Sequence, residues 1–403
     1  MGPHQSGRLI KIGPVALSGR PAFLDIMQTM KGNIVEKNNH SFAVQLKGVL
    51  KRFGKVVAVQ KMDLDFEEGS LVTLLGPSGC GKTTILRMIA GLESPTEGDI
   101  YIKGRRVNDI PIHKRNLGMI FQNYALFPHK TIFDNVAFGL KYRNVAKNEI
   151  GAKVKKALEM VRLPGVENRM PSQLSGGQQQ RIAMARAIVI EPDVLLMDEP
   201  LSALDENLRE EMRREIDNLQ QMLGVTTVFV THDQREALSM SDKIVVMDDG
   251  LKQQEGNPEE VYNYPNNHFV ADFLGHSNFF DGVVANREGD MVSVDLNDGN
   301  QFRVVHPGEW TQGEPIELVV RAQNVKVLSA DMPSPEPDMN SFGGTIKDRS
   351  YMGGEVSYFV ELESGTMVHA IGIAKLRPMR KGTSIRVHVA PRHCGLLKVV
   401  KQT

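Results

Sequence analysis

The sequence predicts an α/β domain built on a mostly parallel sheet, followed by a smaller all-β domain. Between residues 41 and about 275, short apolar runs alternate with stretches of helical periodicity, which is the pattern of βαβ units. After Gly275 the pattern changes to short segments of alternating apolar and polar residues, separated by Gly, Asp and Asn. We therefore expect a tail over residues 1–40, an α/β domain over 41–275 and a β domain over 276–403.

The composition excludes a disordered protein. The chain also has no net charge that would attract a polyanionic partner such as a nucleic acid. The chain has 403 residues, 41% of them hydrophobic, and its 48 basic side chains balance 48 acidic ones. Two cysteines, Cys80 and Cys394, are too few for a disulfide framework, which fits a reducing compartment.

The sequence contains no uninterrupted apolar run of ~18 residues, the length that a membrane-spanning helix needs. We therefore expect any membrane association to come through a partner. Residues 1–40 lack the layout of a signal peptide. We interpret them as a loose tail, and Met27 and Met30 leave open that translation starts later or that the segment is not native.

Four apolar runs are expected to form buried strands of the α/β domain, at residues 71–75, 194–197, 227–230 and 243–247. Strands of this kind, alternating with helices, favour a sheet that is covered on both faces.

A helical subdomain is expected over about residues 122–190. The sequence is helical in character throughout 122–181, with capping-box spacing at residues 131–134 and apolar residues at helical intervals over 147–161. In the β domain, the proline-rich residues 331–337 are expected to form a solvated loop.

A glycine-rich loop follows the first predicted strand. Residues 76–83, Gly-Pro-Ser-Gly-Cys-Gly-Lys-Thr, match the pattern G-x-x-x-x-G-K-[ST] and lie between a predicted strand and a predicted helix. Glycines let backbone N–H groups turn towards phosphates, and the helix N-terminus adds a positive dipole. Lys82 would reach the β- and γ-phosphates, and the Thr83 hydroxyl would bind Mg²⁺. The sequence thus predicts a P-loop NTPase core.

Two carboxylates end the strand predicted at residues 194–197. Asp198 would lie at the carboxyl end of the strand, beside the phosphate site, where it can hold Mg²⁺. Glu199 would face the attacking water. Taken alone, the pair could also be two surface acids at a strand end.

A second glycine-containing segment, Leu174-Ser175-Gly176-Gly177-Gln178, precedes a helix predicted over residues 179–189. The start of this helix can bind an anion but has no lysine, so it requires a phosphate that is held elsewhere. Here the sequence resembles the ABC-transporter ATPase family, whose signature motif reads LSGGQ. A bare LSGGQ could be a helix cap, but its occurrence with a P-loop and an acidic strand excludes a chance match.

The resemblance extends to further motifs. Phe53 resembles the aromatic residue that stacks on adenine, where relatives often have Tyr; a core phenylalanine is the alternative. Gln122 resembles the Q-loop glutamine, which contacts Mg²⁺ and water and senses the membrane partner. Residues 202–205 resemble the D-loop at the dimer interface, and His232 resembles the switch histidine that contacts the γ-phosphate.

The resemblance therefore implies a complete site for ATP and Mg²⁺. The implied catalytic residues are Glu199, His232, Gln122 and Lys82, and the implied metal ligands are Thr83, Gln122 and Asp198. The implied nucleotide-binding residues are Phe53, Gly76, Pro77, Ser78, Gly79, Cys80, Gly81, Lys82, Thr83, Thr84, Gln122, Ser175, Gly176, Gly177, Gln178, Asp205 and His232. It also implies a head-to-tail homodimer, in which the P-loop of one copy and the signature motif of the other hold each ATP.

The C-terminal part resembles a subgroup of importer ATPases for polyamines, ferric ion, phosphonates and sugars. The resemblance rests on residues 262–265 and 269–275, and on residues 123–129 after the Q-loop. In that subgroup the trailing β segments form an OB-like accessory domain. Residues 351–358 resemble the polyamine and ferric-ion relatives more than the sugar ones. We expect spermidine or putrescine as cargo, and the other cargoes stay open.

The subgroup resemblance also implies partners and a location. The partners are transmembrane permease subunits, received in a groove that residues 123–131 partly line, and indirectly a periplasmic or surface substrate-binding protein. The location is the cytoplasmic face of the bacterial inner membrane. An ordinary helix–loop surface is the alternative for residues 123–131.

Two other functions fit the sequence less well. A non-transport ABC ATPase would usually carry tandem cassettes or a coiled-coil or zinc insertion, and this chain has one cassette and neither insertion. A nucleic-acid-binding module needs a basic groove and stacking aromatics. Residues 290–317 are instead rich in acids and hold only Phe302 and Trp310 as aromatics, so we expect no nucleic acid partner.

Overall fold

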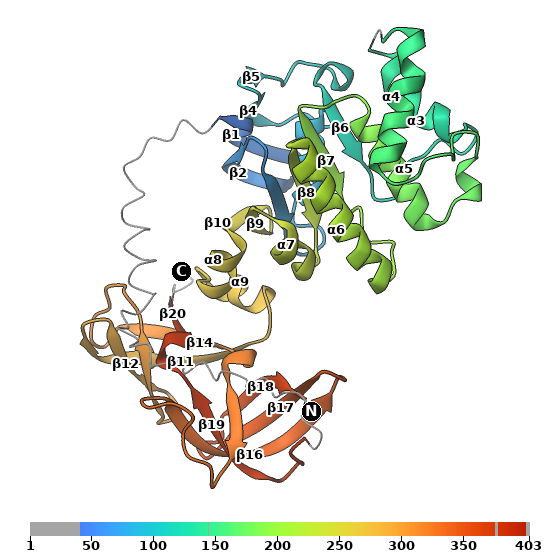
Figure 1. Cartoon of the computed structure of the whole chain (residues 1–403). Helices are drawn as coiled ribbons and strands as arrows, with labels where there is room; N and C mark the ends of the chain where they lie inside the picture. Colours follow the sequence, from blue (N-terminus) through green and yellow to red (C-terminus); the bar gives the residue numbers. More distant parts are fainter. Residues whose placement is uncertain (1–40, 144, 375–377, 400–403) are drawn as a thin grey trace, which may run out of the picture. The chain divides into compact units, whose positions relative to one another are not determined.

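The computed structural model describes residues 41–143, 145–374 and 378–399 (Figure 1). The tail expected over residues 1–40 lies outside these described residues. Among the helices of the described residues, none combines the length and the apolarity that a bilayer-spanning segment requires.

A six-stranded sheet forms the centre of the α/β part, in the order β10-β9-β3-β8-β7-β6. β9, β3, β8, β7 and β6 are parallel, and β10 pairs antiparallel with β9. Every residue of β3, β7 and β8 is buried, as expected for a parallel sheet covered on both faces. The four predicted strands are confirmed to within one residue at each end. The strands are β3 (Leu71–Leu75), β6 (Leu117–Ile120), β7 (Val194–Asp198), β8 (Thr226–Thr231), β9 (Lys243–Asp248) and β10 (Leu251–Gly256).

A second sheet, with four antiparallel strands in the order β2-β1-β4-β5, was not predicted from the sequence. Its strands are β1 (Phe42–Phe53), β2 (Val56–Glu67), β4 (Glu97–Ile102) and β5 (Arg105–Arg106). β1 turns back into β2 at Gly54, whose φ is 58°. Buried residues of this sheet share one core with β3 and with helix α2 (Lys82–Ala90), so the two elements that flank the glycine-rich loop are firmly anchored.

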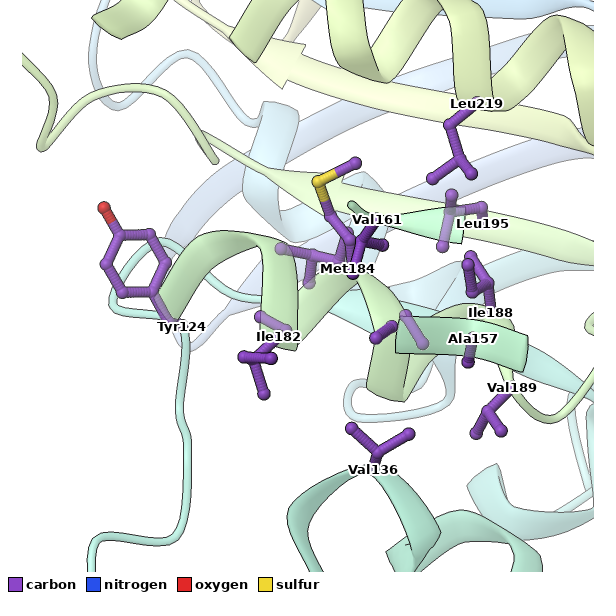
Figure 2. Packing of buried hydrophobic residues seen from close by; sticks show 14 of the residues in the cluster. Tyr124, Val136, Ala157, Val161, Ile182, Met184, Ile188, Val189, Leu195 and Leu219 are labelled. Carbon is purple, nitrogen blue, oxygen red and sulfur yellow. The ribbon is translucent and has the colours of Figure 1, made fainter. Parts of the chain in front are cut away.

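Three helices form the expected helical part: α3 (Ile132–Lys141), α4 (Lys147–Met160) and α5 (Gly176–Ile188). Figure 2 shows Val136 of α3, Ala157 of α4 and Ile188 of α5 in one apolar cluster with Leu195 of β7. The expected cap is present, because the Asp134 N–H donates to Thr131 Oγ1 at 3.1 Å.

The prediction of helix throughout residues 122–181 is wrong between α3 and α4, at residues 142–143 and 145–146, and for two longer segments. Residues 122–131 and 161–175 form turns, with one short 3₁₀ segment at Pro171–Gln173. Pro128, Pro164 and Pro171 lie in these segments, and each proline removes a backbone donor that a continuing helix would need.

The remaining helices of the α/β part begin at polar caps. They are α6 (Glu206–Leu223), α7 (Gln234–Met240), α8 (Pro258–Asn263) and α9 (His268–Phe273). Asp205 and Asp233 cap α6 and α7 by accepting hydrogen bonds from backbone N–H groups of the first turn.

The C-terminal part consists of two five-stranded antiparallel sheets around one apolar core. The first has the order β13-β12-β11-β14-β20, with β11 (Ser277–Glu288), β12 (Met291–Leu296), β13 (Gln301–Val305), β14 (Pro315–Arg321) and β20 (Cys394–Lys398). The second has the order β15-β19-β16-β17-β18, with β15 (Lys326–Ser329), β16 (Asn340–Tyr351), β17 (Glu355–Leu362), β18 (Met367–Ile373) and β19 (Ser384–Val389). Residues 331–337 lie in the connection between β15 and β16, which confirms the predicted loop.

Two buried asparagines join these sheets. Asn278 of β11 accepts from the His369 N–H at 2.7 Å and donates to the His369 carbonyl at 2.8 Å. Asn340 of β16 makes the same pair of bonds with the backbone of Arg303, at 2.7 and 2.9 Å. Each side-chain amide therefore pairs with a backbone N–H and C=O as a neighbouring strand would. Without it, these buried backbone groups would have no hydrogen-bond partner.

The buried cysteine of this part should be unreactive. Cys394 is 5% exposed, and burial raises the pKa of its thiol to about 12. Because the thiolate is the reactive form, only about 10⁻⁴ of the thiol is ionised at about pH 8. In a Cys80→Ser variant, whose only cysteine is Cys394, we expect iodoacetamide to modify the denatured protein but not the folded one, as read by mass spectrometry. Rapid alkylation of the folded variant would contradict this.

Candidate active site

Residues 76–81 form a tight loop between β3 and α2, as the glycine pattern predicts, and Lys82 and Thr83 begin α2. Gly79 and Gly81 have φ values of 85° and 103°. Residues other than glycine rarely adopt such positive φ values. A Cβ on Gly81 would lie 2.5 Å from the Ala58 oxygen, and one on Gly76 would lie 2.2 Å from the Met247 oxygen. Glycine is therefore required to close this loop.

Lys82 folds back over the loop that precedes it. Its Nζ donates to the carbonyl oxygens of Gly76 and Pro77 at 2.7 Å each, and lies 3.7 Å from Cys80 Sγ. Only 4% of the residue is exposed, so the ammonium group is held at the loop. Together with the N-terminus of α2, it gives the loop the positive potential that phosphate groups require.

Thr83 and Asp198 place two oxygen ligands side by side. The Thr83 hydroxyl donates to Asp198 Oδ1 at 2.8 Å, which joins the first turn of α2 to the end of β7. Burial raises the pKa of Asp198, against the opposing effects of the Thr83 hydrogen bond and of Arg87. Carboxylate and hydroxyl oxygens are ligands that Mg²⁺ prefers, and a bound cation would favour the ionised carboxylate. The donor set therefore fits Mg²⁺.

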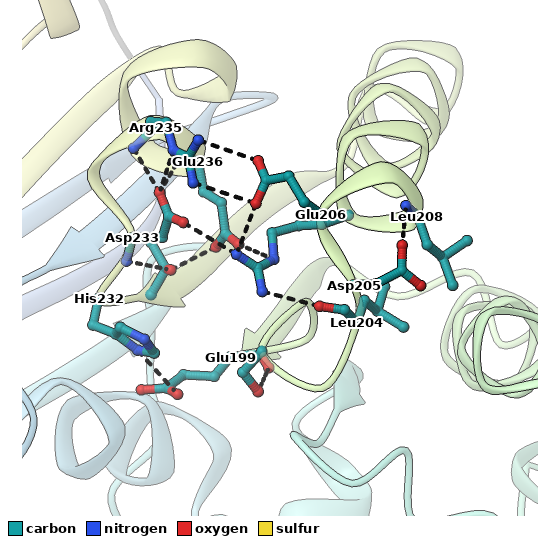
Figure 3. Close-up of polar contacts among 12 residues, drawn as sticks. Glu199, Leu204, Asp205, Glu206, Leu208, His232, Asp233, Arg235 and Glu236 are labelled. Carbon is teal, nitrogen blue, oxygen red and sulfur yellow. Dashed lines mark hydrogen bonds and ion pairs between the residues drawn. The ribbon is translucent and has the colours of Figure 1, made fainter. Parts of the chain in front are cut away.

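Glu199, His232 and Gln122 come together where three neighbouring parallel strands end. Glu199 Oε2 lies 3.3 Å from His232 Nδ1 and 3.5 Å from Gln122 Nε2. The backbone of Glu199 has a φ of 45°, which is unfavourable for glutamate, and its N–H donates to the Val230 carbonyl at 3.0 Å. Figure 3 shows the result, with the Glu199 carboxylate facing His232.

Ser175 caps α5, which begins at Gly176 and not at the predicted Gln179. The Gln178 N–H donates to Ser175 Oγ at 3.4 Å, and the Ser175 N–H donates to Gln178 Oε1 at 3.0 Å. A Cβ on Gly177 would meet the Leu208 side chain at 3.0 Å, so glycine lets α5 approach α6 closely. Ser175 and Gly176 are exposed at the helix N-terminus, the end that stabilises an anion.

Phe53 lies at the end of β1 with its ring accessible. The residue is 47% exposed, which excludes the alternative of a core phenylalanine. Lys51 Nζ lies 4.6 Å from the ring centroid. An exposed ring of this kind can stack on a planar base.

Arg186 of α5 holds the segment after Gln122, and sequence reasoning missed it. Its Nη1 donates to the Ala125 carbonyl at 2.6 Å and its Nη2 to the Tyr124 carbonyl at 2.7 Å. Tyr124 and Ala125 have φ values of 61° and 47°, so these bonds fix an otherwise unfavourable backbone. The partners are more than 60 residues apart in the sequence, and no local pattern reveals them.

Comparison with known proteins agrees with this geometry. A model of the family described as "ABC transporter" matches residues 59–202, and a "TOBE domain" model matches residues 318–397. A protein of Rubrobacter xylanophilus named spermidine/putrescine import ATP-binding protein PotA is 44% identical over 359 residues, which are 88% of this chain and 93% of that protein. The chain belongs to the ABC transporter family.

Further relatives of the same name support the assignment to this ABC family. The protein from Clostridium novyi is 43% identical over 89% of this chain and 98% of its own length, and that from Oleidesulfovibrio alaskensis is 46% identical over 80% and 86%. Among solved structures, cbiO1 from Clostridium perfringens, part of the ABC transporter complex cbiONQ, matches with a TM-score of 0.52 and 27% identity, covering 55% of this chain and 90% of that one.

As an ABC ATPase, the chain binds ATP. Most of the predicted site residues fall into two groups, and Phe53, at the end of β1, lies in neither. The first group lies at the carboxyl edge of the parallel sheet: the glycine-rich loop, Asp198, Glu199, Gln122 and His232. The second group, residues 175–178, lies at the start of α5 in the helical part. Asp205, which lies between Glu199 and His232 in the sequence, accepts from the Leu208 N–H at 3.0 Å, so its carboxylate has a fixed place at the start of α6.

Proposed function

We propose that the chain is the ATP-hydrolysing subunit of a bacterial importer for polyamines, spermidine or putrescine. The observation that carries the proposal is the match to relatives named for that import, over 88% and 89% of this chain. The family models match both the ATPase part and the β part. Residues 351–358, which resemble polyamine and ferric-ion relatives, span the end of β16, the turn and the first half of β17.

In this proposal Lys82 and the loop N–H groups bind the β- and γ-phosphates of ATP, and Phe53 stacks on the adenine. Thr83 and Asp198 would hold Mg²⁺, with Gln122 at the same site, and the ion would supply positive charge beside the phosphates. Glu199 accepts a hydrogen bond from the attacking water and orients it for in-line attack. His232, 3.3 Å from Glu199, is placed to donate towards the γ-phosphate.

A second copy of the chain completes the site in this proposal. The exposed Ser175 and Gly176 at the N-terminus of α5 have their own anion-binding capacity but no neighbouring lysine. Each ATP would therefore lie between the glycine-rich loop of one copy and Ser175 of the partner subunit. Hydrolysis then depends on the pairing of two copies.

The segment 123–131 is proposed to receive the transmembrane permease subunits. Arg186 and Asn135 both hold its backbone: Asn135 Oδ1 accepts from the Phe127 N–H at 2.8 Å, and its Nδ2 donates to the Lys130 carbonyl at 3.1 Å. A segment braced in this way, directly after Gln122, can pass a permease movement to the site. The protein would then lie at the cytoplasmic face of the inner membrane, with a substrate-binding protein on the other side.

The test is ATP hydrolysis by the complex that co-purifies with this chain, with its substrate-binding protein present. We expect spermidine or putrescine to stimulate hydrolysis, whereas ferric ion, phosphonates and sugars leave it unchanged. Stimulation by one of these other compounds would keep the importer and correct the cargo. A chain that co-purifies with no membrane protein, and whose hydrolysis responds to ribosomes or nucleic acid, would contradict the transport function.

A further inference from the structure

An arginine on α6 joins the segment after Glu199 to the segment around His232. Arg209 Nη2 donates to the Leu204 carbonyl at 2.9 Å. Its Nη1 lies 3.5 Å from Asp233 Oδ2, and its Nε lies 3.8 Å from Glu236 Oε1. Figure 3 shows Glu206 facing Arg235, and Leu204 on the opposite side of this cluster from Asp233. One guanidinium group therefore contacts both segments that enter the site.

Glu236 needs this arginine because it is buried. The residue is 4% exposed, and burial raises the pKa of its carboxyl group, against the Thr231 hydrogen bond and the charges of Arg209 and Arg213. A buried carboxylate is strongly unfavourable unless a cation and hydrogen bonds compensate it. Arg209 pairs with Glu236, and the same guanidinium group donates a hydrogen bond to the Leu204 carbonyl.

Glu236 in turn fixes the two neighbours of His232 in the sequence. The Thr231 hydroxyl donates to Glu236 Oε2 at 2.5 Å and accepts from the Asp233 N–H at 3.0 Å. Asp233 is held a second time, by Arg209. His232 itself is exposed on 52% of its side chain, so its position is set through these neighbours and through Glu199.

Hydrogen bonds also join Leu204, which Arg209 contacts, to Glu199. Ser202 Oγ donates to the Glu199 carbonyl at 3.0 Å, and the Leu204 N–H donates to the Leu201 carbonyl at 3.2 Å. The residues from Glu199 to Leu204 thus form one closed turn, and Arg209 binds the last carbonyl of that turn. Glu199 and His232 are therefore linked twice, directly and through Arg209.

We propose that Arg209 and Glu236 are positioning residues for ATP hydrolysis, which hold His232 against Glu199 and tie both to the D-loop carbonyl of Leu204. The inference rests on the proposed roles of Glu199 and His232. Because Leu204 lies in the segment expected to contact a second copy, a shift of that segment on pairing is transmitted to His232.

The test compares Arg209→Ala and Glu236→Gln with Arg214→Ala in the complete transporter complex. Arg214 lies on the same helix with 76% of its side chain exposed and pairs with Glu210, so it is the matched control. We expect Arg209→Ala to lower kcat about tenfold with the KM for ATP nearly unchanged, because positioning acts on the transition state. Glu236→Gln keeps the side-chain volume and an acceptor for Thr231, and should lower kcat in the same direction. Arg214→Ala should match the wild type.

A double-substitution cycle separates positioning from general stability. If Arg209 acts through His232, then Arg209→Ala causes no further loss of kcat in a His232→Ala background. Wild-type kcat in both Arg209→Ala and Glu236→Gln, or an equal loss with and without His232, would overturn the inference. Glu199→Gln is measured in parallel. If that variant stays active, the proposed catalytic role of Glu199 is wrong. This failure is distinguishable from a failure of the positioning role, in which Glu199→Gln is inactive but Arg209→Ala and Glu236→Gln behave as the wild type.

Discussion

Glu199→Gln is expected to lower kcat for ATP by about 10²–10⁴-fold while leaving ATP affinity nearly unchanged. Glutamine keeps the size of the side chain and its contacts with His232 and Gln122, but it is a poor base. Loss of the carboxylate therefore removes the group that we propose polarises the attacking water, and leaves the phosphate-binding loop intact. Single-turnover hydrolysis and equilibrium binding of a fluorescent ATP analogue measure the two quantities separately.

The control for this substitution is Glu149→Gln, which removes an exposed carboxylate from the first turn of α4. We expect that variant to hydrolyse ATP as the wild type does. A Glu199→Gln protein with near wild-type turnover would show that another group activates the water.

Lys82→Ala is expected to weaken ATP binding by about 10–100-fold, the effect of losing a charge-assisted hydrogen bond to phosphate. The Nζ of Lys82 is held at the loop by two carbonyl oxygens. Residues 76–83 contain no other basic residue that could replace it. The loop backbone should survive, because its conformation depends on Gly76 and Gly81. Isothermal titration with ATP and Mg²⁺ measures the change.

Lys155→Ala serves as the control for charge alone, because Lys155 is exposed on α4. Its ATP affinity should equal that of the wild type. Equal affinities in Lys82→Ala and the wild type would contradict the assignment of the loop as the phosphate site.

The elements that could be predicted from the sequence are those whose pattern is local. β3 and β7 are continuous apolar runs, buried on both faces, and their ends carry the glycine-rich loop and the Asp198–Glu199 pair. The loop glycines are forced by positive φ and by close backbone approach, which the spacing of the motif already encodes. The strand positions followed from these local signals, whereas Gln122 and His232 were expected at the site only because the sequence resembles the ABC-transporter ATPase family.

The features that were missed depend on contacts between distant residues. β1 and β2 pair with several register shifts, which break the simple alternation that would have indicated a sheet. Arg186 and Arg209 are ordinary helix residues in sequence, and only their partners on other segments show their roles. The prediction of a helix across residues 122–131 is wrong because Arg186 and Asn135 hold the backbone of this segment by hydrogen bonds. Its own periodicity does not determine its conformation.

A disulfide between two copies tests most directly whether the ATP site is shared. Ser78 and Ser175 are both exposed, one on the glycine-rich loop and the other at the start of α5. In a Cys80→Ser, Glu199→Gln background, copies with Ser78→Cys are mixed with copies carrying Ser175→Cys, and oxidised in ATP and Mg²⁺. We expect a covalent dimer on a non-reducing gel from the mixture and none from either variant alone. A mixture that yields only monomers would contradict a site built from two chains.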